Sequence, residues 1–104
     1  MTRGTTPTHT LTVPVDVATV SKATVAYAQF GKVIIKKSPE ACEISGTGTY
    51  TTVTVHLTQE ETLKFNQKEV VEIQMKILFT DGNVALTNIS RVSTNDCLDE
   101  EILE

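Results

Sequence analysis

The chain has 104 residues, which is enough for one domain. A chain of this size buries roughly 60–70% of its unfolded surface, so it can form a core without disulfides or metals. The formal net charge of −4 argues against binding to nucleic acid or to an anionic membrane surface, because both need a basic footprint. Aromatic residues make up 5% and Trp is absent, so we expect a core built mainly from Val, Ile, Leu and Ala.

The cysteines and the start of the chain indicate the cellular compartment in which the protein is made. The chain has two cysteines, Cys42 and Cys97, whereas a disulfide-built domain of this length usually has more, so we expect two reduced thiols. The opening residues 1–10 lack the apolar stretch of a signal peptide. No apolar run approaches the roughly 20 residues needed to span a bilayer. These features predict a protein made in the cytoplasm, without membrane insertion.

The chain begins with an expected arm and a first strand. Residues 1–8 are rich in Thr and lack a core-forming pattern, which predicts a flexible N-terminal arm. Apolar and polar residues then alternate up to Val15, and Pro14 places this strand at a sheet edge or ends it. Asp16 can cap a single turn that extends through Thr19.

A hairpin is expected next. Thr24–Phe30 and Lys32–Lys37 are rich in strand-forming residues, and Gly31 lies between them. Val25 and Tyr27 share one face of the first strand. Ala26 and Ala28 share the other, where their small size suggests close packing or mild exposure.

Two further strands and one helical turn follow. Cys42–Ser45 is a candidate short strand, residues 46–48 (Gly-Thr-Gly) form a turn, and Tyr50–Leu57 alternates as a strand. Residues 58–61 (Thr-Gln-Glu-Glu) match a capping box, in which the first and last side chains satisfy each other's backbone amides. We expect a helix over Gln59–Lys64, after which Leu63 or Phe65 closes the end of the core.

The clearest pattern in the chain is the alternation over Val70–Phe79. Five apolar residues fall on one parity and mainly polar ones on the other, which predicts a strand with one buried and one wet face. Asp81-Gly82 is a strong hairpin signal. The parity of the apolar residues changes near Thr87-Asn88, which predicts a bulge or a strand that switches sheets before the last strand, Asn88–Ser93.

Six to eight short strands with one helical turn predict an all-β fold, an immunoglobulin-like antiparallel β-sandwich. The helical turn would be the crossover between the two sheets. The domain would span residues 9–95, between the arm at 1–8 and an acidic C-terminal tail at 96–104.

No catalytic, cofactor or metal site is expected. His9 and His56 are the only histidines, and with Cys42 and Cys97 they do not reproduce the ligand spacing of a zinc site. Glu60-Glu61 is the most obvious carboxylate pair, but the helix cap accounts for it.

Two features are candidates for partner binding. Lys32, Lys36 and Lys37 form a basic group that could dock an acidic surface, including the acidic tail of a second copy, or could simply protect a strand edge. The tail contains three apolar residues among its carboxylates, and we expect these residues to anchor it to a partner: Leu98, Ile102 and Leu103.

Several stretches together resemble a family of small proteins encoded in phages and prophages of Firmicutes, near tail and baseplate genes. They are MTRGTTPTHTLTVP, LTQEETLKF, VEIQMKILFTDGNVALTNI and RVSTNDCLDEEILE, which lie at residues 1–14, 57–65, 71–89 and 91–104. The resemblance is weakest between residues 37 and 52. More loosely, the strand containing Glu-Ile-Gln and its hairpin resemble the N-terminal domain of the baseplate upper proteins of lactococcal siphophages, a β-sandwich that attaches receptor-binding parts.

The resemblance implies a non-enzymatic structural protein of a phage tail or baseplate, made in the bacterial cytoplasm and incorporated in the virion. Its partners would be other tail or baseplate proteins or further copies of itself, as a homo-oligomer. Two alternatives stay open. One is a module that binds carbohydrate or a cell surface, and the other is an intracellular phage factor that binds a host protein.

Overall fold

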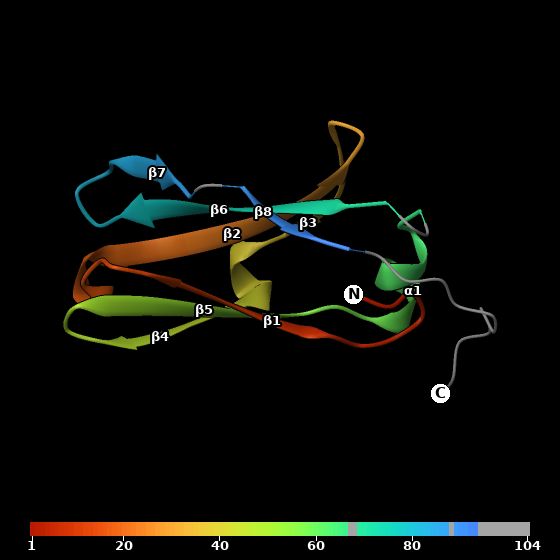
Figure 1. Ribbon diagram of the computed structural model, residues 1–104. Helices are drawn as coiled ribbons and strands as arrows, with labels where there is room; N and C mark the ends of the chain where they lie inside the picture. The colour runs from red at the N-terminus through yellow and green to blue at the C-terminus, as the bar shows by residue number, and fades with distance from the viewer. Residues whose placement is uncertain (67–68, 88, 94–104) are drawn as a thin grey trace.

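The structure is a computed structural model that describes residues 1–66, 69–87 and 89–93. Within these residues the chain forms two antiparallel sheets, one short helix and two 3₁₀ turns (Figure 1). The strands are β1 (Thr8–Val13), β2 (Val20–Gln29), β3 (Lys32–Lys37), β4 (Cys42–Thr47), β5 (Tyr50–His56), β6 (Val71–Phe79), β7 (Val84–Leu86) and β8 (Ser90–Val92), the helix is α1 (Gln59–Leu63), and the 3₁₀ turns are Val17–Thr19 and Pro39–Ala41.

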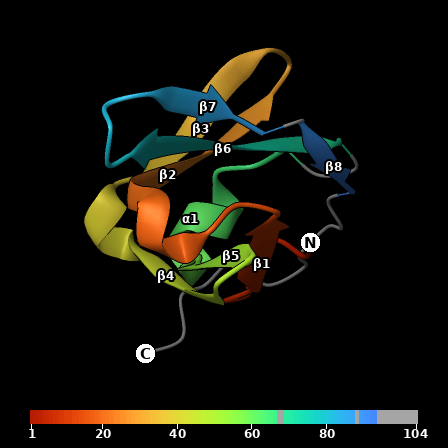
Figure 2. The same cartoon turned by 90° about the vertical axis from the view of Figure 1, so that its left-hand side faces the viewer.

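The two sheets form the layers of a β-sandwich, as Figures 1 and 2 show from two sides. The three-stranded sheet has the order β1-β5-β4. The five-stranded sheet has the order β3-β2-β6-β7, and β8 also pairs with β6. The expected all-β fold of two antiparallel sheets is therefore confirmed.

The core lies between the layers and depends on the pairing of β2 with β6. In this pair Val25 opposes Met75 and Tyr27 opposes Ile73, and all four side chains face inward and are buried. They pack against Val53, Val55 and other buried residues of the three-stranded sheet. The alternation that predicted a half-buried strand over Val70–Phe79 is thus confirmed.

The chain crosses from one sheet to the other through α1, which lies at one end of the sandwich (Figure 1). The predicted capping box is present: the Thr58 hydroxyl accepts from the Glu61 amide, and the Glu61 carboxylate accepts from the Thr58 amide. Phe65 follows the helix, is 1% exposed and packs against the Tyr27 ring. It is Phe65, and not the half-buried Leu63, that closes the end of the core.

The N-terminal residues contact this same end of the sandwich. The Gly4 amide donates to the Thr62 hydroxyl, which in turn donates to the Thr5 carbonyl. The Met1 ammonium donates to the Ser93 carbonyl at 2.6 Å. The segment expected to be a flexible arm is therefore hydrogen-bonded to α1 and to the residue after β8.

The connections in the five-stranded sheet follow the turn signals. Phe30 and Gly31 both have positive φ, 54° and 72°, and form the two-residue turn between β2 and β3. The predicted Asp81-Gly82 turn joins β6 to β7. Leu86 pairs with Lys76, whereas Ser90 pairs with Ile73, so one extra residue lies between β7 and β8. The expected register break is therefore present, and both strands pair with β6 in the same sheet.

Two predicted boundaries were wrong. β2 begins at Val20 rather than Thr24, because the long strand β6 continues to pair with it as far as Phe79. β4 continues to Thr47, so the turn that was expected at residues 46–48 lies at residues 48–49. Gly46 is a strand residue with φ 156°, where any Cβ would collide with the Tyr50 carbonyl.

The strand order differs from that of constant-type immunoglobulin domains. There the second strand shares a sheet with the first, fourth and fifth strands. Here β2 lies in the other sheet, between β3 and β6. The sandwich is present, and its immunoglobulin-like topology is not confirmed. Among the described residues, no helix has the length and hydrophobicity needed to cross a membrane.

The two-sided character of β6 can be tested by truncating neighbouring side chains. Met75 is fully buried and Lys76 is exposed on the opposite face. Met75→Ala should lower the free energy of unfolding by about 2–5 kcal/mol through the cavity that it leaves. The control Lys76→Ala should change it by less than about 0.5 kcal/mol. Urea denaturation measures both, and equal losses would contradict the assigned register.

Candidate interaction surface

The solvent side of the five-stranded sheet, here called the outer face, is a broad surface without a covering layer among the described residues (Figure 1). Strand pairing places its side chains in four rows. These rows are Lys22–Leu78–Val84, Thr24–Lys76–Leu86, Lys36–Ala26–Gln74, and Val33–Ala28–Glu72–Arg91.

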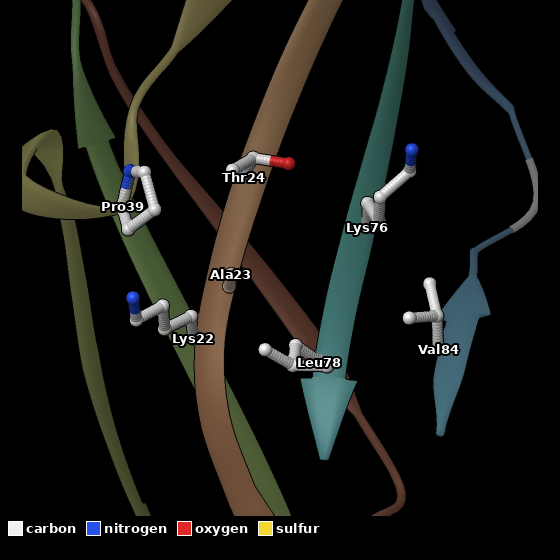
Figure 3. Close-up of a pocket in the computed structure, with 7 residues that line it drawn as sticks. All are labelled: Lys22, Ala23, Thr24, Pro39, Lys76, Leu78 and Val84. Carbon is white, nitrogen blue, oxygen red and sulfur yellow. The ribbon is translucent and has the colours of Figure 1, made fainter. Parts of the chain in front are cut away.

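Three adjoining hollows run along the outer face, with volumes of about 240, 210 and 270 Å³. The first has almost wholly apolar walls and is drawn in Figure 3, where Leu78 lies between Lys22 of β2 and Val84 of β7. The other two share the small side chain of Ala26 as part of their floor. Small residues on β2 between larger ones on β3 and β7 thus make the face concave.

Large apolar side chains are exposed on this face. Val84 and Leu86 of β7 are each 58% exposed, and Val33 of β3 is 56% exposed. A contiguous apolar surface on a small protein is typical of a binding site. The sequence contained part of this signal, because Ala26 and Ala28 share one parity and Val84 and Leu86 share another, but it did not show that these strands belong to one sheet with β6 between them.

The charges of the outer face are unevenly matched. Glu72 pairs with Arg91 of β8 at 3.6 Å. Within the described part of the chain, Lys36 and Lys76 have no carboxylate partner. Lys76 lies on a central strand, so protection of a sheet edge does not explain its presence. The face therefore presents cations beside exposed aliphatic side chains.

The structure separates the three lysines that the sequence grouped together. Lys32 is exposed beside the β2–β3 turn, and Lys36 lies on the outer face opposite Ala26. A bulge at Ile34 changes which side of the sheet the following side chains point to. As a result Lys37, which pairs with the buried Val25, points toward the core. Its ammonium lies 2.6 Å from the Glu61 carboxylate and is only 13% exposed. Lys37 is thus engaged within the fold.

Glu61 joins the helix cap to the edge strand β3. Burial works against its charged form, but hydrogen bonds from Lys37 and from the Thr58 amide outweigh burial, so the pKa of Glu61 is lowered. Inward-pointing charges and bulges are common ways to block an edge strand from further pairing. The inward, ion-paired position of Lys37 therefore fits protection of the β3 edge, and it differs from the solvated position that docking an acidic surface would need.

The remaining predicted anchors, Leu98, Ile102 and Leu103, lie outside the described residues, as does Cys97. Cys42 is a buried free thiol, and burial raises its pKa. No group of three or more potential metal ligands occurs in residues 1–66, 69–87 and 89–93.

The two histidines have ordinary structural partners. His9 Nδ1 shares a 2.8 Å hydrogen bond with the Tyr27 hydroxyl between the sheets, and burial, followed by the charge of the N-terminus, lowers the pKa of His9. Burial also raises the pKa of Tyr27. His56 Nδ1 lies 2.8 Å from the Thr8 hydroxyl on the neighbouring strand. Both contacts tie β1 to the rest of the sandwich.

A fourth hollow, of about 380 Å³, lies where the free edge of β1 faces the β7–β8 side of the other sheet. Its walls come from residues 10–13 together with Thr87 and Ser90, and they are about equally polar and apolar. It has neither the exposed large aliphatic side chains nor the lysines of the outer face, so the outer face is the stronger candidate.

Comparison with known proteins gives no independent assignment. No protein-family model matches the chain, and no curated protein matches it significantly.

The role of Glu61 can be tested with its exposed neighbour Glu60 as the matched control. Glu61→Gln should lower the free energy of unfolding by about 1–3 kcal/mol at pH 7, because it removes the ion pair with Lys37 and weakens the cap. Glu60→Gln should change it by less than about 0.5 kcal/mol. Chemical denaturation checks both values.

The same comparison has a defined pH dependence. The folded-state pKa of Glu61 lies below the usual value of 4.5, so its stabilisation is present above that pH and is lost as the pH falls through the folded value. The gap between wild type and Glu61→Gln should therefore shrink below about pH 4.5. A gap that is constant with pH would show that the carboxylate charge is not involved.

Proposed function

We propose that the protein is a non-enzymatic assembly module that works through protein–protein contacts. The observation that carries this proposal is the outer face, where Val84, Leu86 and Val33 are more than half exposed beside three adjoining hollows. Burial of such side chains against a partner is favourable by about 25 cal/mol per Å² of apolar surface.

The size of the domain is compatible with this role. A protein interface of standard size buries about 800 Å² on each partner. The whole described surface of this protein is 6358 Å², so one such interface would take a substantial share of it. A face that spans four strands offers the breadth that such a contact needs.

We further propose that the setting is a phage or prophage particle, where the protein is a tail or baseplate component. This part of the proposal is supported by the resemblance of residues 1–14, 57–65, 71–89 and 91–104 to the Firmicutes phage family. The protein would then contact other tail or baseplate proteins or further copies of itself.

The carbohydrate-binding alternative has less support. Sugar sites usually present exposed aromatic rings together. Phe30 and Tyr50 are 70% and 53% exposed, but Phe30 lies in the β2–β3 turn and Tyr50 opens β5 in the other sheet. Tyr27 and Phe65 are buried in the core. A glycan array tests this alternative, and binding to a host protein is tested by the location of the protein in infected cells.

The direct test of the proposal is mass spectrometry on gradient-purified particles from an induced lysogen that carries this gene. Peptides of this protein should occur at a fixed ratio to a known tail protein, in particles that sediment together. The lysate is the control for expression. Abundant protein in the lysate with none in the particles would contradict a virion component and leave an assembly helper or a host-directed factor.

A further inference from the structure

The two parts of this chain have opposite charge. Residues 96–104 contain five of the thirteen acidic side chains and none of the nine basic ones. The rest of the chain therefore has nine basic and eight acidic residues, a formal charge of +1 against −5 for the C-terminal segment. Such a chain can attract its own acidic end, either on the same copy or on another.

The outer face has the features that would hold this segment. Lys36 and Lys76 lack carboxylate partners within the described residues. Lys36 lies in the row of Ala26 and Gln74, and Lys76 lies in the adjacent row with Leu86. Leu86 shares a row with Lys76, and the small side chain of Ala26 shares a row with Lys36. An acidic segment with a few aliphatic residues complements this combination of cations and apolar hollows.

We propose that residues 96–104 of one copy dock on the outer face of a second copy. This inference rests on the contact role proposed above and names the partner as another molecule of the same chain. Leu98 and Ile102 fill the hollows around Ala26 and Leu86. The carboxylates between them face Lys36 and Lys76.

The spacing of the apolar residues fits either regular conformation. Leu98 and Ile102 are four residues apart, so their side chains share one side of a helix and also one side of a strand. Asp99, Glu100 and Glu101 lie between the two anchors in sequence, so their carboxylates are close to both. The docking therefore needs no particular secondary structure in the segment.

The position of the last described residues favours a second copy over the same copy. Val92 pairs with Val71 at the start of β6, next to the row that contains Glu72. Lys76 lies five residues further along β6, which is about 17 Å at the rise of a strand. Because β8 runs antiparallel to β6, from Ile73 toward Val71, the chain leaves the sheet heading away from Lys76, and the acidic segment of the same copy would have to turn back over that distance. A segment from another copy can approach the lysines directly.

Binding can be measured with a labelled peptide of residues 94–104 and the full chain as receptor. The receptor carries Leu98→Asp and Ile102→Asp, so that its own segment does not compete. Fluorescence anisotropy in reducing buffer should show saturable binding that weakens with added salt, since the contact includes exposed charges. A peptide with the same residues in scrambled order is the control for charge alone.

The outer face is then tested with matched charge reversals in the same receptor. Lys36→Glu with Lys76→Glu should weaken peptide binding at least tenfold. The matched control compares single reversals: Lys76→Glu alone should weaken binding, whereas Lys64→Glu, at an exposed position beside α1, should leave it within about twofold, because exposed charges further apart than about 10 Å are largely screened. Circular dichroism confirms that each variant is folded. No saturable binding, or equal losses in Lys76→Glu and Lys64→Glu, would overturn the docking site.

The identity of the partner is tested by sedimentation of the unmodified full chain. Wild type should associate as its concentration rises, and Leu98→Asp with Ile102→Asp should remain monomeric. A wild-type protein that stays monomeric well above the peptide dissociation constant would overturn docking between copies, because the segment would then lie on its own face. These results use purified protein, so they are independent of whether the protein is found in phage particles.

Discussion

The structure depends on one pair of strands, β2 and β6, whose side chains are apolar on the inner side and a mixture of polar, charged and small apolar residues on the outer side. The inner sides, with Val25, Tyr27, Ile73 and Met75, supply most of the five-stranded sheet's contribution to the core. The opposite sides of the same strands form the centre of the outer face. Because adjacent residues of a strand alternate between faces, the register that buries the core also fixes which residues the outer face exposes.

The polar contacts of the fold help to explain why Lys36 and Lys76 can contact a partner whereas Lys37 cannot. Lys37 points inward and pairs with Glu61, a carboxylate that also caps α1. This contact holds the edge strand β3 to the crossover between the sheets. Lys36, one residue earlier, faces the opposite side and joins Lys76 on the outer face. The candidate surface therefore combines residues from an edge strand and a central strand.

Features with a local cause were predictable from the sequence, and those that depend on pairing between distant strands were not. The capping box at Thr58 and Glu61 is a local motif, and the alternation around Met75 needs only neighbouring residues. The inward position of Lys37 depends on a bulge at Ile34, and the placement of β2 between β3 and β6 depends on the whole sheet. Lys36 and Lys76 reach the same face only through the pairing of β3, β2 and β6, so the sequence pointed to lysines of a single hairpin instead.

A dilution series of ¹⁵N-labelled full-length protein, followed through its amide chemical shifts, would locate the surface of self-association directly. Docking on the outer face predicts concentration-dependent shifts at Ala26, Gln74, Lys76 and Leu86 and in residues 96–104, with little change in β4 and β5. Shifts that centre on the three-stranded sheet, or spectra that do not change with concentration, would contradict the assignment of the outer face as the surface through which this protein binds a second copy.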